Sequence, residues 1–129
     1  MTRAAFSLRA FSIYMFCLGA VLVVAPNVLL TLFGVAETRE VWIRIVGMLI
    51  LILGYLDFMA AGSELQPYIR WTVPVRLSVP VFLIAFVALG YGPPILILFG
   101  AIDAGGAIWT AIGLRRDAAA AGARVGAKP

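Results

Sequence analysis

Histidine is absent from this sequence, and cysteine occurs once, at Cys17. Histidine is the commonest metal ligand and the commonest general base, so haem, zinc and triad chemistries lack their usual side chain. A single cysteine cannot form a disulfide within the chain, and inside an apolar run it is poorly placed to form a reactive thiolate. We therefore expect no metal site, no cofactor and no enzymatic activity.

Charge is scarce as well. Only 12% of the 129 residues are charged and 64% are hydrophobic, whereas a soluble domain averages about 45–50% apolar and 25% charged residues. This composition indicates an integral membrane protein whose main partner is the lipid bilayer. The net charge of +4 comes from basic residues that flank apolar runs, which suits a membrane surface, so we expect no binding of nucleic acid.

The apolar residues fall into four runs of membrane-spanning length. We place the predicted spans at about residues 8–25, 41–61, 73–90 and 95–114. The fold class is therefore predicted to be all-α, an integral membrane four-helix transmembrane bundle that forms one domain over residues 1–114. Residues 115–129 are rich in alanine and glycine and lack apolar periodicity, so a disordered cytoplasmic tail is expected there.

Prolines and glycines mark the predicted boundaries. Pro26 should end or kink the first helix because proline lacks a backbone donor and clashes with the preceding turn. Residues 28–33 are too short to cross again and are expected to lie at the membrane interface, with Gly34 as their stop. Pro80 should bend the third span and free a carbonyl, and residues 91–94, Tyr-Gly-Pro-Pro, predict a tight turn.

The second predicted span carries two charges, Arg44 near its start and Asp57 near its end. At 100° per residue these charges share one helix face with Gly47 and Gly54. Small residues let helices approach closely in lipid, so this face should pack against a neighbouring helix. Gly106, on the fourth predicted span, is expected to serve in the same way.

Depths estimated from the span midpoints predict two ion pairs. Asp57 and Arg76 lie at similar depth on consecutive spans, and Arg44 could reach from about 10 Å away toward Asp103 near the midplane, with Glu40 as a competitor. An unpaired charge at the bilayer centre would cost about 2.5–3.5 kcal/mol. Two interpretations are open: fixed ion pairs that select one helix arrangement, or a proton or ligand site around Asp103.

Basic residues predict the orientation. With four spans, eight of the ten basic residues share one side: Arg3, Arg9, Arg70, Arg76, Arg115, Arg116, Arg124 and Lys128. Arg39 and Arg44 fall on the other side, so the positive-inside rule places both termini in the cytoplasm. The basic start of the first span is also compatible with a signal peptide cut after Ala25. Pro26 directly after that position disfavours cleavage, so an uncleaved helix is expected.

The chain resembles small bacterial four-span membrane proteins of the BphX-like and DoxX-like type in three stretches, VWIRIVGMLILILGY, WTVPVRLSVPVF and GAIDAGGAIWT. The resemblance covers about Pro26 to Leu114. It implies a four-helix bundle of the bacterial inner membrane, sometimes encoded beside oxidative or aromatic-degrading enzymes. It implies no catalytic residue, so the candidate site rests on physical argument and consists of Arg44, Asp57, Arg76 and Asp103.

Three functional hypotheses follow. The first is a non-enzymatic accessory or scaffold subunit of the inner membrane, in a homo-oligomer or a larger membrane complex, with buried ion pairs that fix its helices. The second is a small proton-coupled transporter or carrier that acts as an oligomer, because four helices enclose little cavity. The third is a quinone- or lipid-handling membrane enzyme, which would need a borrowed cofactor because the chain has no histidine and no redox motif.

Overall fold

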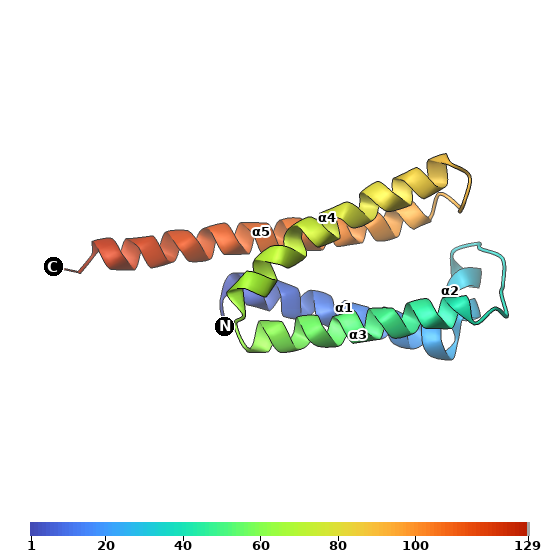
Figure 1. Cartoon of the computed structure of the whole chain (residues 1–129), viewed down its shortest axis with the longest axis horizontal. Helices are drawn as coiled ribbons and strands as arrows, with labels where there is room; N and C mark the ends of the chain where they lie inside the picture. Colours follow the sequence, from blue (N-terminus) through green and yellow to red (C-terminus); the bar gives the residue numbers. More distant parts are fainter. Residues whose placement is uncertain (129) are drawn as a thin grey trace. The chain divides into compact units, whose positions relative to one another are not determined.

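The computed structural model describes residues 1–128, which form five α-helices and no strand. The helices are α1 (Arg3–Val24), α2 (Pro26–Leu32), α3 (Trp42–Gly62), α4 (Gln66–Ala88) and α5 (Leu96–Gly126) (Figure 1). All except α2 are long and apolar enough to cross a membrane. The predicted fold class, all-α with four membrane-length helices, is confirmed.

The chain divides into two compact units. One unit, which we call the terminal unit, combines residues 1–8 with the described chain from Ala60 onward. The other, the hairpin unit, is Arg9–Met59. Helices α1 and α3 each contribute residues to both units.

Large apolar side chains cover the outside of the long helices. Leu53 of α3 is 51% exposed, and Val81 and Phe82 of α4 are 67% and 59% exposed. Apolar exposure on this scale marks a surface that meets lipid or another protein rather than water. The exposed surface therefore agrees with the hydropathy of the helices and indicates a multi-pass membrane protein.

Within the hairpin unit, α1 and α3 approach through their backbones at two facing glycines. A Cβ atom on Gly47 would lie 2.9 Å from the Gly19 carbonyl oxygen, and one on Gly19 would lie 2.9 Å from the Gly47 carbonyl oxygen. Farther along α3, a Cβ atom on Gly54 would lie 3.1 Å from Cβ of Met15. The small-residue face of α3 thus lies against α1, where any larger residue would push the backbones apart.

The short helix α2 follows α1 after a single residue. Its first residue is Pro26, whose fixed φ suits the first turn of a helix and whose missing N–H is not needed there. The helix has seven residues, and Gly34 beyond it adopts a φ of +68°. The predicted break at Pro26 and the stop at Gly34 are both present in the structure.

Within the terminal unit, α4 and α5 run side by side as a helical hairpin (Figure 1). Gly90, with a φ of +78°, follows α4 and begins the connection that contains Pro93 and Pro94. The two helices approach closely at Gly100, where a Cβ atom would lie 2.8 Å from Cα of Pro80. The proline of α4 is therefore matched by a glycine of α5, which leaves space for the ring.

Helix α4 begins earlier than the predicted span of residues 73–90. It starts at Gln66, with Pro67 in its first turn. A proline at that position costs no hydrogen bond, so Pro67 begins the helix instead of interrupting it. As a consequence Pro74, which is the second residue of the predicted span, lies inside the helix together with Pro80.

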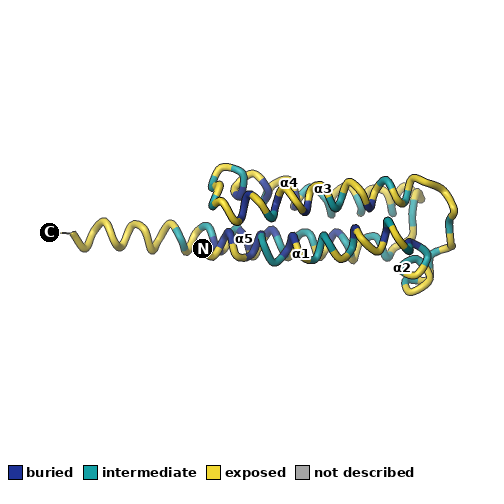
Figure 2. The backbone as a smooth tube through the Cα atoms, turned by 90° about the horizontal axis from the view of Figure 1, so that it is seen from below, coloured by how far each residue is buried: buried dark blue, intermediate teal, exposed yellow. Residues whose placement is uncertain are grey.

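Helix α5 ends later than the predicted span of residues 95–114. The tail expected to be disordered, residues 115–129, is helical as far as Gly126. Alanine has the highest intrinsic helix propensity, which favours a helix even without an apolar stripe. At 1.5 Å per residue the 31 residues of α5 measure about 46 Å, more than the roughly 30 Å of a hydrocarbon core. Residues 118–128, which include the end of α5, are exposed and yellow in Figure 2.

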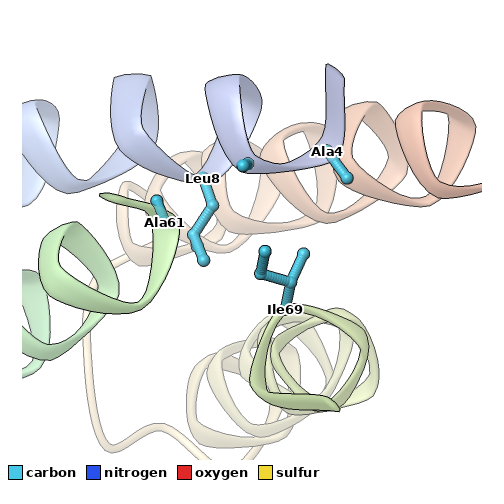
Figure 3. Packing of buried hydrophobic residues seen from close by; sticks show 5 residues of the cluster. Ala4, Leu8, Ala61 and Ile69 are labelled. Carbon is cyan, nitrogen blue, oxygen red and sulfur yellow. The ribbon is translucent and has the colours of Figure 1, made fainter. Parts of the chain in front are cut away.

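A compact apolar cluster joins the start of α1 to α3 and α4 within the terminal unit. Figure 3 shows side chains of this cluster pointing toward one another. Its buried members are Ala4, Ala5, Leu8, Ala61 and Ile69, with the partly buried Tyr68 and Leu114 packed against them. Three of the buried residues are alanines, which allow the helices to approach closely.

The glycine contact of the hairpin unit predicts a strong response to a single methyl group. Gly47→Ala should destabilise the protein by about 1–3 kcal/mol, because the added Cβ meets backbone atoms of α1 that cannot move aside. The measurement is the thermal unfolding midpoint in one detergent. Gly105→Ala is the matched control, since a Cβ there meets nothing within 4 Å and gains helix propensity. Equal midpoints for both variants would contradict the close contact.

Candidate functional site

Three polar side chains from three helices meet inside the terminal unit. They are Ser7 of α1, Arg76 of α4 and Thr110 of α5, and each is at most 5% exposed. The Arg76 Nη2 group donates a hydrogen bond of 2.7 Å to the Thr110 hydroxyl. The hydroxyls of Ser7 and Thr110 are 2.8 Å apart. We call this group the buried polar cluster, and it ties α1, α4 and α5 together.

The hydroxyl protons of the buried polar cluster can be arranged in two complete ways. Ser7 can donate to Thr110 while Thr110 donates to the Gly106 carbonyl, 3.0 Å away. Alternatively, Thr110 can donate to Ser7 while Ser7 donates to the Ala4 carbonyl, 2.8 Å away. In both arrangements Thr110 also accepts from Arg76. Because a hydroxyl has one proton and two lone pairs, each of the two hydroxyl protons has an acceptor in both arrangements.

The four charged residues predicted from the sequence are divided between the two units. Arg44 and Asp57 belong to the hairpin unit, and Arg76 and Asp103 belong to the terminal unit. Asp57 is 6% exposed and Arg76 is 5% exposed, while Asp103 is half-buried. The ion pairs of Asp57 with Arg76 and of Arg44 with Asp103 would each join the two units, and both pairs stay predictions.

Arg44 caps the end of α1 within the hairpin unit. Its Nη1 group donates to the carbonyl of Val23 and, at 3.3 Å, to the carbonyl of Val24. The last carbonyls of a helix have no partner inside that helix, and a cation is favoured at the negative end of the helix dipole. Arg44 therefore has a structural role that follows from the break before Pro26, although the sequence analysis sought only a carboxylate partner for it.

Two carboxylates hold the start of α1 within the terminal unit. Asp117 accepts hydrogen bonds from the backbone N–H groups of Arg3 and Ala4, at 3.2 and 3.0 Å. Glu64 accepts from the backbone N–H and the hydroxyl of Thr2, both at 2.7 Å. The first N–H groups of a helix lack intrahelical partners and favour negative charge. The sequence pattern predicts neither contact, because both partners are distant in the chain.

Glu64 occupies an unusual backbone position in the short connection between α3 and α4. Its φ of 52° lies in the left-handed region that few residues other than glycine adopt. The hydrogen bond from the Thr2 hydroxyl lowers the pKa of the Glu64 carboxyl, and the Thr2 backbone N–H lowers this pKa further, while partial burial opposes both effects. The deprotonated carboxylate of Glu64 is thus the form that binds Thr2.

Comparison of the chain with families of known proteins, with curated proteins and with solved structures finds no match. The resemblance to BphX-like and DoxX-like proteins therefore stays a prediction. The helices and their contacts define the class: an all-helical protein with four membrane-length helices, in which buried hydroxyl and guanidinium groups connect helices of the terminal unit.

The buried polar cluster predicts a specific effect of Thr110→Val. This change keeps the shape of the side chain but removes the acceptor of Arg76 and the partner of Ser7, so it should cost about 1–3 kcal/mol of stability. Thr72→Val is the matched control, because the buried Thr72 hydroxyl donates to the Ile69 carbonyl of its own helix, at 2.8 Å. Thermal unfolding in one detergent compares the two. A loss no larger for Thr110→Val than for Thr72→Val would contradict the role of the cluster.

The Glu64 contact predicts a dependence of stability on pH. The folded pKa lies below the ordinary value of 4.5, so this stabilisation is complete above pH 4.5 and is lost as pH falls through the folded pKa. Unfolding midpoints of wild type should drop in that acid range, and the drop should be smaller in Glu64→Gln. Glu40→Gln, an exposed residue, makes the same charge change as a control. An equally steep drop in Glu64→Gln would rule out this contribution.

Proposed function

We propose that the chain is a non-enzymatic multi-pass protein of the bacterial inner membrane that serves as an accessory or scaffold subunit. The observation that carries this proposal is the buried polar cluster. Its three side chains bind one another and helix carbonyls, so the hydroxyl groups are used to join helices. A substrate site needs polar groups that can turn toward a ligand, whereas these groups are engaged in fixing the helix arrangement.

The proposed topology has both termini in the cytoplasm. The contact of Asp117 with Arg3 and Ala4 supports one shared side, because it brings the start of α1 to the part of α5 that follows its apolar stretch. That same end carries Arg115 and Arg116, and cytoplasmic membrane boundaries are enriched in basic residues.

The proposed partners are the lipid bilayer and a protein complex, either a homo-oligomer or an assembly with other membrane subunits. The exposed apolar side chains of α3 and α4 suit both contacts, because lipid tails and the apolar face of another span are equally non-polar. In this proposal the predicted pairs of Asp57 with Arg76 and of Arg44 with Asp103 are structural and fix the fold that the partner recognises.

A proton-coupled transporter is the second candidate, and the burial of two acidic residues favours it. Asp57 is 6% exposed and Asp103 is half-buried, and both lie on membrane-length helices. Carboxylates in such positions are costly and often mark proton pathways. This candidate would act as an oligomer.

The two candidates differ in what Asp103→Asn should do. If the carboxylate is structural, removing one partner of a buried pair should cost about 3–5 kcal/mol, and liposomes that contain wild type should show no proton flux. Glu40→Gln, which removes the same charge at an exposed residue before α3, is the control for both measurements. An unchanged unfolding midpoint, together with proton-coupled flux that Asp103→Asn abolishes, would replace the scaffold by the transporter.

The scaffold role is tested directly by the mass of the native particle. The protein is cross-linked in intact membranes and then solubilised in a mild detergent. The solubilised complex should have a mass well above the 13.8 kDa of one chain. The same cross-links should reappear after reconstitution with the isolated partner. A monodisperse single chain under both conditions would contradict the proposal.

A further inference from the structure

A groove of about 390 Å³ runs along the terminal unit where the start of α1 lies beside α5. Its principal lining residues are Arg3, Phe6, Trp109, Ile112, Gly113 and Arg116. All of them belong to the terminal unit. The groove is open at the surface. Its lining includes neither the buried polar cluster nor the carboxylates of Asp117 and Glu64.

The middle of the groove is apolar and lies at the surface. Phe6 is 59% exposed, Trp109 48% and Ile112 45%, and the rings of Phe6 and Trp109 meet edge to face with centroids 6.2 Å apart. A Cβ atom on Gly113 would lie 2.8 Å from the backbone nitrogen of Ala4. No side chain can therefore fill the floor at this point. Aromatic residues of this kind are typical of the membrane–water boundary.

Two arginines stand at the polar end of the groove. The guanidinium groups of Arg3 and Arg116 are exposed and make no hydrogen bond or ion pair with residues 1–128. The nearby carboxylate of Asp117 already accepts the backbone N–H groups of Arg3 and Ala4. These two cations differ in this respect from Arg44 and Arg76, which donate to carbonyl and hydroxyl oxygens within the protein.

We propose that this groove binds an anionic phospholipid of the surrounding membrane. The phosphate lies between the guanidinium groups of Arg3 and Arg116, whose planar N–H pairs match phosphate oxygens. An acyl chain lies along Phe6, Trp109 and Ile112, directed into the hydrocarbon layer. The proposal rests on the membrane location of the chain but not on its scaffold role, so either can fail without the other.

Charge and hydrophobicity together point to a lipid rather than to free phosphate. A free anion would gain nothing from the exposed aromatic rings. A zwitterionic lipid, whose phosphate is accompanied by its own cation, would gain less from the two guanidinium groups than an anionic lipid. Each arginine near an anionic surface contributes about 1 kcal/mol, a factor of about five in binding. The two arginines together should therefore enrich anionic lipid in the groove over a neutral lipid of the same chain length.

Fluorescence of Trp109 reports the occupancy of the groove. The full chain, with Trp42 and Trp71 replaced by phenylalanine, is reconstituted into vesicles of phosphatidylcholine and phosphatidylglycerol, one of which carries brominated acyl chains. Bromine quenches tryptophan on contact. At equal mole fraction, brominated phosphatidylglycerol should quench Trp109 several-fold more than brominated phosphatidylcholine, and this preference should shrink at high salt because ions screen exposed charges.

Two double variants separate the groove from the general surface charge. In Arg3→Gln/Arg116→Gln the preference should disappear. In Arg115→Gln/Arg124→Gln, which removes the same charge from α5 outside the groove lining, it should persist. Circular dichroism and the unfolding midpoint establish that each variant is folded, and the salt series on the unmodified groove tests the proposal independently of the variants.

Equal quenching by the two brominated lipids in the parent protein would overturn the proposal. A loss of preference to the same degree in both double variants would overturn it as well, because it would assign the effect to net charge. Displacement of the lipid by millimolar inorganic phosphate would identify a soluble anion as the occupant and contradict a lipid site.

Discussion

Hydrocarbon offers no water to a hydrogen-bonding group, so each polar side chain that lies inside the hydrocarbon layer must find its partner within the protein. Ser12, Thr72 and Ser78 solve this locally, since each hydroxyl donates to the carbonyl three residues earlier in its own helix, at 2.6–2.8 Å. Thr110 also uses a carbonyl of its own helix, but in addition it reaches Ser7 and Arg76. A hydroxyl group can therefore bind within its own helix, as in Ser12, or connect three helices, as in Thr110.

Close backbone approach decides which hydroxyls can act between helices. Ala4 and Ser7 are three residues apart on α1, and Thr110 and Gly113 are three residues apart on α5, so each pair shares a helix face. The contact of Gly113 with the Ala4 backbone brings these two faces together, and the short hydroxyl side chains then meet at 2.8 Å. A larger residue at Gly113 would separate the helices and leave buried donors without partners, which costs more than a surface contact.

The apolar runs were enough to predict four membrane-length helices, because length and hydropathy depend little on tertiary context. The ends of α4 and α5 were not predictable in the same way. Pro67 is compatible with a loop or with a first helical turn, and the alanine-rich segment after Arg116 combines high helix propensity with an absence of apolar periodicity. Each pattern is compatible with two structures, and the sequence pattern alone does not select between them.

The candidate site was likewise only partly predictable from the sequence. Arg76 could be recognised as a candidate because it is the one charged residue of the predicted span 73–90. Neutral residues such as Ser7 and Thr110 are common in membrane helices, and nothing in the sequence indicates which partner they bind. The prediction for Arg44 considered only carboxylates, whereas the Val23 and Val24 carbonyls satisfy its Nη1 group. A search for partners among side chains misses backbone carbonyl groups, and these carbonyls are free to accept hydrogen bonds where a helix ends.

The two ends of α1 show how charge is used at the membrane boundary. Carboxylates of Asp117 and Glu64 bind the backbone or side chain at its start, and the cation of Arg44 binds its last carbonyls, so each charge opposes the local sign of the helix dipole. These charged groups therefore bind partners within the protein. Arg3 and Arg116 make no side-chain hydrogen bond or ion pair within residues 1–128. Two exposed cations beside the exposed rings of Phe6 and Trp109 suit a molecule outside the chain that carries both negative charge and an apolar body.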